Sequence, residues 1–442
     1  MLNQIKRLRG SLTLPGDKSI SHRALLFAAI GTGQSRLHGL GTGEDIQRTA
    51  ACLQQLGVAI SRDGAVTTVD SPGFGHWLPP AQPLDCGNSG TTMRLLAGLL
   101  AAHPGLRATL DGDASLRQRP MARVVAPLLA MGAQIAAADG KPPLHVVGHA
   151  LHGAVHVLPV ASAQVKSALL LAGLFAVGET VVVEPLPSRD HTERLLAALG
   201  VPLRSLGTRH AIDGHGPQAA LPPLGDLQVP GDPSSAAFVL VAAVLHPDAA
   251  VTVRQVAHNP TRSGYLQVLA RMGAVVRAQA LAPEGGEPVA ELHAHSAPLQ
   301  ATDIAASEVP TLIDEVPILA LAAAAAQGTS HFHGLAELRV KESDRLAAIV
   351  RLLDALGVAT AHGGDWLTIH GCGSARAFSG RGSARAFSGR GGTFRPGLDH
   401  RMAMTAAIAN LCGASALEIS GFSEAVASSW PDFAHAITGL AA

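Results

Sequence analysis

Charged side chains beside glycine- and serine-rich turns are the residues of this chain whose types and spacing could do chemistry. The segment GDKSISHR is the first of them. If a helix begins near Asp17, Ser19 and Arg23 lie on one helix face, with Lys18 at the helix entrance. A cation, a hydroxyl and unpaired backbone N–H groups at a helix N-terminus bind anions. The alternative interpretation is a capped helix whose lysine and arginine are only solvated.

Four further segments repeat this combination of polar turn, cation and apolar helix. GNSGT (87–91) leads into a helix that contains Arg94, and Gly90 would let a ligand approach the backbone amides. Arginine is the natural bidentate partner of carboxylate or phosphate. The other three segments supply Arg117 and Arg119 in LRQRPM, Ser162 and Gln164 in ASAQVKS, and Ser188 and Arg189 in PSRDH. Each of these segments alone has a purely structural interpretation as a helix start.

Acidic residues appear in two apolar contexts later in the chain. Asp314 and Glu315 precede the apolar run VPILALAAAAA, where a carboxylate can gain proton affinity and act as a base. In ELRVKESDRL, Glu342 lies between two cations, Lys341 and Arg345, which combines anion binding with proton transfer. The alternatives are an acidic helix cap and a salt-bridged surface helix. Taken together with LDHRMAM, whose Arg401 opens another apolar helix, these segments predict a cleft between two domains that binds two anions.

A recurring phrase indicates the elements that position these residues. The phrase consists of the end of an apolar helix, then Leu or Met, then Gly and a strand. It occurs at Leu56, Met131, Leu199, Met272 and Leu356, with a truncated copy at Thr438. Glycine after a helix adopts the left-handed conformation that ends it. The phrases LPGDKSISHRALLFAA (14–29) and VPGDPSSAAFVLVAA (229–243) are also similar. The two patterns predict six related α/β units in two halves.

Composition narrows the class of protein. The 442 residues exceed the usual size of one hydrophobic core, which favours two domains. Hydrophobic residues make up 47% but aromatic residues only 3%, so the core must consist of Ala, Leu, Val and Ile. Equal numbers of basic and acidic residues, 33 each, argue against bulk binding of nucleic acid or of a membrane. The scattered cysteines and the lack of a signal-peptide pattern favour the cytoplasm, and histidine pairs without neighbouring ligands argue against a metal.

The motifs, taken in order, resemble the EPSP synthase (3-phosphoshikimate 1-carboxyvinyltransferase) family over nearly the whole chain. They are LPGDKSISHR, GNSGTTMR, RQRPM, ASAQVKSALLLAG, PSRDHTE, VPGDPSSAAF, IDEVPILA, LRVKESDRL and LDHRMAM. The resemblance implies an α/β fold of two inside-out barrel domains, each of three repeated βαβαββ-type units, with a cleft between them. We assign 14–229 to the first domain, and 1–13 with 230–442 to the second.

The resemblance also implies a reaction, which is transfer of enolpyruvyl from phosphoenolpyruvate to the 5-hydroxyl of shikimate 3-phosphate with release of phosphate, in chorismate and aromatic amino acid biosynthesis. No cofactor or metal is implied, and a monomer is expected. Asp314 would take the hydroxyl proton, and Glu342, with Lys18 as the alternative, would protonate C3. Shikimate 3-phosphate would be held by Lys18, Ser19, Arg23, Ser162, Ala163, Gln164, Arg189, Asp314 and Lys341. Phosphoenolpyruvate would be held by Lys18, Gly90, Arg119, Gln164, Arg345 and Arg401.

Some positions depart from the best-known branch of the family. Ser428 replaces a lysine, His191 a tyrosine and Ala163 a serine, whereas a second branch, known for herbicide tolerance, has GDASLxxRPM and ASAQVKSA phrases like those of this chain. Tolerant members of that branch have Ala at the position of Gly90, so we expect Gly90 to leave room for the inhibitor glyphosate.

Two alternative functions remain. The related UDP-N-acetylglucosamine enolpyruvyl transferase uses a loop cysteine, which DGDASLRQRP lacks. A phosphometabolite-binding protein without catalysis is the other alternative. The direct repeat of GSARAFSGR at 373–381 and 382–390 predicts a surface loop produced by duplication, and it could perturb the neighbouring segment LDHRMAM.

Overall fold

The computed structural model describes residues 5–373, 392–412 and 417–441, which form a mixed α/β fold. The chain divides into two compact units. The first unit contains Gly16–Val229 and Pro283–Glu287, and the second contains Met1–Pro15, Pro230–Ala282 and Pro288–Ala442. In the described ranges no helix combines the length and the apolar character that crossing a membrane requires.

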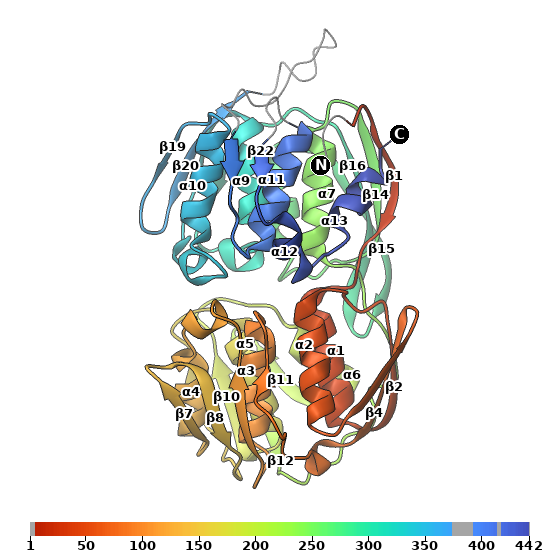
Figure 1. Cartoon of the computed structure of the whole chain (residues 1–442), viewed down its shortest axis with the longest axis vertical. Coiled ribbons are helices and arrows are strands. Elements are labelled where there is room, and N and C mark those ends of the chain that lie inside the picture. Colours follow the sequence, from red (N-terminus) through yellow and green to blue (C-terminus); the bar gives the residue numbers. More distant parts are fainter. Residues whose placement is uncertain (1–4, 374–391, 413–416, 442) are drawn as a thin grey trace. The chain divides into compact units, whose positions relative to one another are not determined.

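The first unit contains three four-stranded sheets with one shared topology (Figure 1). In each sheet the first two strands are parallel and the remaining neighbours are antiparallel. In spatial order the sheets are β13 (Asp226–Gln228), β2 (Thr32–His38), β4 (Val66–Pro72) and β3 (Ala59–Asp63); β5 (Leu84–Asp85), β6 (Arg107–Asp111), β8 (Lys141–Val147) and β7 (Gln134–Ala138); and β9 (Val155–Val157), β10 (Val177–Val183), β12 (Arg209–His215) and β11 (Leu203–Leu206).

The second unit repeats the same beginning of each sheet, with a parallel pair followed by an antiparallel neighbour in its two larger sheets. Its third sheet, within the described residues, is the parallel pair alone. The sheets are β1 (Leu8–Thr13), β14 (Ala249–Ala257), β16 (Glu287–His295) and β15 (Val276–Glu284); β17 (Asp303–Ile304), β18 (Gln327–Phe332), β20 (Leu367–Cys372) and β19 (Thr360–His362); and β21 (Gly392–Phe394) with β22 (Leu417–Ile419).

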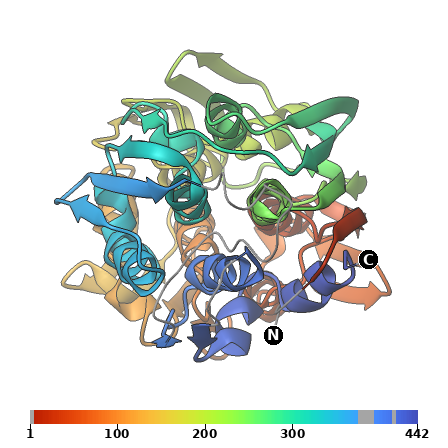
Figure 2. The same ribbon diagram turned by 90° about the horizontal axis from the view of Figure 1, so that it is seen from above.

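Each unit has one set of buried helices and one set with an exposed side. The buried helices are apolar almost all round, which is typical of helices without a solvent face. In the second unit α7, α9 and α11 pack against one another, as Figure 1 shows, and Figure 2 shows them nearly end-on. The buried helices are α1 (Lys18–Ile30), α3 (Gly90–Ala101) and α5 (Ala163–Leu174) in the first unit, and α7 (Pro233–Leu245), α9 (Val316–Ala325) and α11 (His400–Cys412) in the second.

The remaining helices lie with one side exposed or are single short turns. The α-helices are α2 (Glu44–Gln55), α4 (Ala122–Ala130), α6 (His191–Ala198), α8 (Gly264–Arg271), α10 (Arg345–Ala355), α12 (Phe422–Ala427) and α13 (Phe433–Thr438). The 3₁₀ turns are η1 (Phe74–His76), η2 (Leu116–Gln118), η3 (Val309–Thr311) and η4 (Ala336–Val340).

Small side chains allow the buried helices to approach closely, as the alanine-rich and aromatic-poor composition predicts. In α3, a methyl group added to Gly98 would lie 2.4 Å from the carbonyl oxygen of Ala168 in α5. A contact below 3 Å is too short for carbon and oxygen, so this position accepts only glycine without a shift of one helix. The contact thus fixes the separation of two helices whose N-termini, each about two turns away from it, carry candidate site residues.

The recurring helix–glycine–strand phrase adopts the predicted conformation in its five full copies. The glycines at 57, 132, 200, 273 and 357 have φ between 71° and 95°, and a strand follows each of them. The truncated sixth copy differs, because Gly439 is right-handed with φ −62°. The chain there forms only an isolated bridge between Ala441 and Leu8.

The similar phrases LPGDKS and VPGDPS also form similar structures. The Asp17 carboxylate caps α1 by accepting from Ile20 N at 2.7 Å, and the Asp232 carboxylate caps α7 by accepting from Ser234 N at 2.7 Å. Both helices therefore begin where the sequence predicts. The duplicated GSARAFSGR segment lies, apart from Gly373, outside the described residues.

Candidate functional site

The first unit holds one group of predicted site residues at the N-terminus of α1. The ammonium group of Lys18 lies 3.1 Å from the Asp45 carboxylate. Arg23 donates to the carbonyl oxygen of Ser19 at 2.9 Å, so these two residues lie one turn apart on the same face, as predicted.

Arg23 is buried, with an exposed fraction of 2%, and its guanidinium bonds to two other helices. Nε donates to Thr192 Oγ1 in α6 and Nη2 to Ser167 Oγ in α5, each at 2.7 Å. Burial lowers the pKa of Arg23 to about 10, the charges of Glu193 and Asp17 oppose this shift, and the charge of Arg189 adds to it. The positive charge of Arg189 thus disfavours the charged form of Arg23, an effect that a bound anion would offset.

A second group in this unit joins the start of α3 to the start of α5. Arg94 Nη1 donates to Gln164 Oε1 at 2.5 Å, and Gln164 Nε2 donates to Thr91 Oγ1 at 2.8 Å. A methyl group added to Gly90 would lie 2.6 Å from Arg94 Nη1 and 3.3 Å from Arg119 Nη1. The structure thus brings Gly90, Arg119 and Gln164 together. Arg94 is central to the group, but its role could not be predicted from the sequence because its partner lies 70 residues away.

The two arginines of LRQRPM have separate environments. Arg119 is mostly buried and donates to Asn88 Oδ1. Arg117 is half exposed, pairs with Asp111 at 2.6 Å, and holds the pKa of that carboxyl below its usual value. Arg117 lines a cavity of about 310 Å³ together with Arg48, Pro83, Asp85, Gly87, Asp111, Gly112 and Asp113.

The remaining predicted residues of the first unit flank α5 and α6. Ser162 is the N-cap of α5 and accepts from Val165 N at 3.5 Å, and Ala163 is the first helical residue. Arg189 lies between buried Ser188 and the cap of α6. Nearby, His191 Nδ1 lies 2.6 Å from the Glu287 carboxylate, and both side chains are buried.

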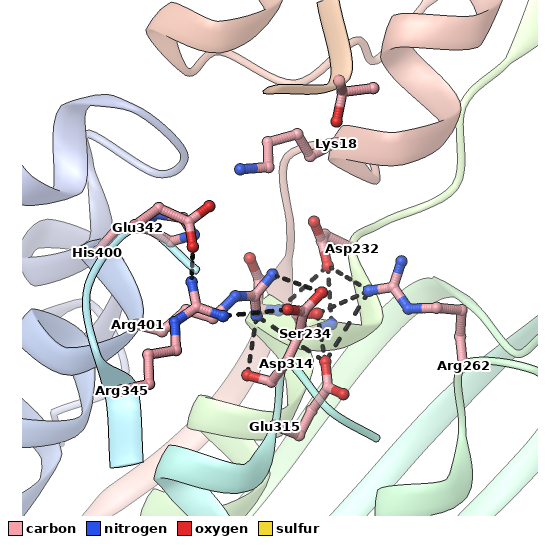
Figure 3. A network of polar contacts seen from close by, with 12 residues as sticks. Lys18, Asp232, Ser234, Arg262, Asp314, Glu315, Glu342, Arg345, His400 and Arg401 are labelled. Carbon is pink, nitrogen blue, oxygen red and sulfur yellow. Dashed lines mark hydrogen bonds and ion pairs between the residues drawn. The ribbon is translucent and has the colours of Figure 1, made fainter. Parts of the chain in front are cut away.

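In the second unit, Asp314 contacts two arginines (Figure 3). Its Oδ1 lies 3.2 Å from Arg345 Nη1 and its Oδ2 lies 3.5 Å from Arg401 Nη2. Asp314 is 8% exposed and directly precedes Glu315, the N-cap residue of α9. The apolar surroundings predicted for this carboxylate are therefore only part of its environment.

Arg345 is the most strongly paired cation of the second-unit group. Each of its three nitrogen atoms contacts a different carboxylate. Nε lies 2.8 Å from Asp399, Nη1 lies 3.2 Å from Asp314, and Nη2 lies 2.5 Å from Glu342. Burial opposes its charge, but the charges of Asp399, Glu342 and Asp314 outweigh burial and raise the pKa of Arg345. The guanidinium is thus a permanent charge in a fixed orientation.

Asp399 is a functional candidate that the sequence did not single out. It is wholly buried, and besides Arg345 its Oδ2 accepts from Ser343 Oγ at 2.8 Å. Its Oδ1 accepts from the backbone N–H of Arg401 at 3.1 Å. One carboxylate therefore orients two predicted ligands. An acidic residue before the apolar run of LDHRMAM is the signal that could have identified it as a cap.

Lys341 lies outside the helix that carries Arg345. It follows η4, and α10 begins at Arg345 with Asp344 as its cap. The four-residue spacing of the two cations therefore spans a loop and a helix start. Ser428, which replaces a lysine of the best-known branch, has its hydroxyl 3.2 Å from His400 Nδ1.

A further buried network lies behind Asp314. Arg262 donates to Ser234 Oγ at 2.7 Å, and Ser234 donates to the Glu315 carboxylate (Figure 3). Over the ranges that the structure describes, no group of three or more His, Cys, Asp or Glu side chains could hold a metal ion. Each unit therefore presents cations, hydroxyls and helix N-termini, and the second adds carboxylates, a set suited to anion binding with proton transfer.

Comparisons with known proteins give a consistent result. The model of the EPSP synthase (3-phosphoshikimate 1-carboxyvinyltransferase) family matches residues 2–437. A 3-phosphoshikimate 1-carboxyvinyltransferase of Synechococcus sp. (strain RCC307) is 47% identical over 435 residues, which cover 96% of this chain and 95% of that protein. The protein of the same name from Thermus thermophilus is 48% identical over 409 residues, covering 91% of this chain and 90% of that protein.

Solved structures agree with the sequence comparisons. A structure of EPSP synthase from Acinetobacter baumannii superposes with a TM-score of 0.85 and 39% identity. The superposition covers 100% of this chain and 97% of that chain. This chain therefore has the same mixed α/β fold as that EPSP synthase structure.

Proposed function

The chain belongs to the EPSP synthase (3-phosphoshikimate 1-carboxyvinyltransferase) family, and from this premise we propose that it transfers the enolpyruvyl group of phosphoenolpyruvate to the 5-hydroxyl of shikimate 3-phosphate. The products are 5-enolpyruvylshikimate 3-phosphate and phosphate. The reaction belongs to the biosynthesis of chorismate and the aromatic amino acids. It requires two anions to approach each other, which cations must make possible.

The observation that carries this proposal is the arrangement around Arg345. A buried guanidinium with three carboxylate contacts keeps its charge and its direction. Two of those carboxylates are Asp314 and Glu342, the residues to which the family resemblance assigns proton transfer. A fixed cation between two acid–base groups can neutralise a carboxylate or phosphate while a proton moves on each side.

The proposed roles follow the family. Asp314 takes the proton of the 5-hydroxyl as the hydroxyl oxygen attacks C2 of phosphoenolpyruvate, and Glu342 or Lys18 delivers a proton to C3. The tetrahedral intermediate then loses phosphate as the C2–O bond to the phosphoryl group breaks and the C3 proton is released.

The substrate contacts are part of the same proposal. Shikimate 3-phosphate is assigned to Lys18, Ser19, Arg23, Ser162, Ala163, Gln164, Arg189, Asp314 and Lys341, and phosphoenolpyruvate to Lys18, Gly90, Arg119, Gln164, Arg345 and Arg401. The neighbouring charges of Arg23 and Arg189 support the first set. The contacts of Gly90, Arg94 and Gln164 support the second.

Several finer statements remain predictions from the family resemblance. They are the inside-out barrel form of each domain, the domain bounds 14–229 and 1–13 with 230–442, and a substrate cleft between the domains. The monomeric state, the cytoplasmic location and inhibition by glyphosate also remain predictions.

Phosphate release tests the proposed reaction. Purified protein is given both substrates, then each substrate alone, and Asp314→Ala is assayed beside the wild type. We expect release only with both substrates, and a loss of at least about a hundredfold in the variant, because general-base catalysis contributes roughly 10²–10⁴-fold.

Asp354→Ala is the matched control, because Asp354 is an exposed aspartate of α10 in the same unit. It should retain wild-type turnover. Folded wild-type protein that releases no phosphate with both substrates present would reject the catalytic proposal. It would favour a phosphometabolite-binding protein without catalysis.

A further inference from the structure

A buried ion cluster in the first unit lies outside the proposed contacts with substrate. Lys166, in the otherwise apolar part of α5, is wholly buried. Its ammonium nitrogen lies 2.7 Å from the Glu184 carboxylate and 2.7 Å from the Glu193 carboxylate. His210 of β12 closes the cluster, with Nε2 3.4 Å from Glu184 Oε1 and Nδ1 3.8 Å from Glu193 Oε1.

Stability alone is a weak reason for such a cluster. Removing two carboxylates and an ammonium group from water is costly, and apolar side chains of similar size often replace buried ion pairs without loss of stability. Burial raises the pKa of Glu184, but the His210 and Lys166 partners outweigh burial and lower it. The Glu184 carboxylate is therefore charged at neutral pH and needs the lysine beside it.

The cluster fixes the loop that carries Arg189. Glu184 follows β10, and its second carboxylate oxygen accepts from the Ser188 hydroxyl. Lys166 Nζ donates a hydrogen bond to the carbonyl oxygen of Ser188 at 3.4 Å. Ser188 is thus held through its side chain and its backbone, and Arg189 is the next residue.

The same two helices hold Arg23 through neighbouring residues. Ser167, next to Lys166, accepts from Arg23 Nη2, and Thr192, next to Glu193, accepts from Arg23 Nε. Thr192 also donates to Ser167 Oγ at 2.8 Å, which joins α5 and α6. The ion pair between Lys166 and Glu193 joins the same two helices through the residues next to Ser167 and Thr192.

We propose that Lys166 is a positioning residue for shikimate 3-phosphate: by joining Glu184, Glu193 and Ser188 it sets the spacing of the Arg23 and Arg189 guanidiniums. This inference rests on the proposed function, which assigns both arginines to that substrate. The two cations repel each other when no anion is bound. A rigid support behind them therefore preorganises the site and improves affinity for the anion.

The test separates positioning from folding. Lys166→Met alone leaves two buried carboxylates without their ammonium partner and is expected to unfold easily. The double variant K166M/E184Q keeps the net charge of the cluster, because it removes one positive and one negative group. It also keeps the Glu193 carboxylate, whose charge favours the charged form of Arg23, and an amide oxygen as the acceptor for Ser188.

Shikimate 3-phosphate binding is measured by calorimetry without phosphoenolpyruvate, and KM for each substrate is measured by phosphate release. For K166M/E184Q with a near-wild-type urea midpoint, we expect Kd and KM for shikimate 3-phosphate to rise about tenfold. KM for phosphoenolpyruvate should stay within about twofold, because the side chains proposed to bind it in this unit, Gln164, Arg119 and Lys18, contact Arg94, Asn88 and Asp45 instead of the cluster. Exposed Lys6→Met is the lysine control and should match the wild type.

Wild-type affinity for shikimate 3-phosphate in the folded double variant would overturn the positioning role and leave the proposed reaction intact. An equal rise in KM for both substrates would also overturn it, since general loosening of the unit would then explain the effect. Wild-type protein that does not bind shikimate 3-phosphate at all would overturn both proposals.

Discussion

Gly90 shows how a single hydrogen atom can determine the geometry of several charged groups. Because a methyl group at this position would lie 2.6 Å from Arg94 Nη1, Gly90→Ala must displace that guanidinium. Arg94 is also the donor to Gln164 at 2.5 Å. The substitution therefore disturbs two residues proposed to bind phosphoenolpyruvate: Gln164, through Arg94, and Arg119, whose Nη1 would lie 3.3 Å from the new methyl group.

We predict that Gly90→Ala raises KM for phosphoenolpyruvate and the inhibition constant of glyphosate, each by about tenfold or about 1.4 kcal/mol. Steady-state kinetics at several inhibitor concentrations measure both. Gly364→Ala is the control, because no atom lies within 4 Å of the added methyl group. Equal inhibition constants for wild type and Gly90→Ala would contradict the idea that Gly90 leaves room for the inhibitor.

Residue types alone predicted which segments carry charge and where helices begin, but not which side chains meet. Asp17, Ser162 and Arg401 lie at helix starts as expected, because caps depend on neighbours a few positions away. The pairing of Arg94 with Gln164 spans 70 residues and that of Arg345 with Asp399 spans 54. Such contacts depend on how the helices pack, which local patterns do not encode.

Among the elements, the glycine that ends a helix is left-handed in the five full copies of the recurring phrase but right-handed in the truncated copy. Gly132, in a full copy of the phrase, has φ +95° and nothing within 4 Å of an added methyl group. Gly439, in the truncated copy, has φ −62°. The two positions differ in conformation while both have room for a side chain, since the nearest atom to a methyl group at Gly439 is 3.4 Å away.

We predict that Gly132→Ala lowers the free energy of unfolding by about 1–2 kcal/mol, because a left-handed residue with a Cβ is strained by that amount. Gly439→Ala should be neutral or stabilise the protein by about 0.5 kcal/mol, since alanine restricts the unfolded chain. Urea denaturation of both variants provides the comparison. Equal destabilisation at the two positions would show that backbone conformation does not determine the cost.

The repeated phrase made the number of α/β units predictable, but the order of strands within each sheet was not. Every sheet of the described residues begins with a parallel pair, and in two sheets one member of that pair comes from a distant segment: β13 lies beside β2, and β1 lies beside β14. Short strands such as β5 and β17 contain two residues each and carry no periodic signal. They are recognisable only beside the strands that they pair with.

At the scale of the whole chain, buried histidines determine how stability changes in mild acid. Burial lowers the pKa of His22, His103, His156 and His258, and Lys18 and Arg23 lower that of His22 further. In the unfolded chain these four histidines gain their protons near pH 6.5, whereas in the folded chain they gain them only at a lower pH. Unfolding therefore takes up protons below this pH, so the free energy of unfolding must fall as the pH falls through 6.5 towards the lowered values.

Carboxylates change the free energy of unfolding in a separate, more acidic pH range. Glu184, Asp111, Asp213, Asp248 and Glu308 all have lowered pKa values. Their contribution is fully present above the ordinary pKa near 4 and is lost only as the pH falls below it. The loss of stability between pH 7.5 and 5.5 is accordingly a histidine effect.

We predict that His22→Gln flattens this part of the profile. His22 is wholly buried and its Nδ1 lies 2.7 Å from Thr49 Oγ1, a contact that glutamine can keep. One histidine that stays neutral in the folded chain costs about 1.4 kcal/mol of unfolding free energy between pH 7.5 and 5.5. Urea unfolding at both pH values should show a loss smaller by about that amount in His22→Gln, and an unchanged loss in the exposed control His362→Gln. A wild-type slope in His22→Gln would mean that His22 gains its proton at the same pH in the folded and the unfolded chain, which would contradict the effect of burial on its pKa.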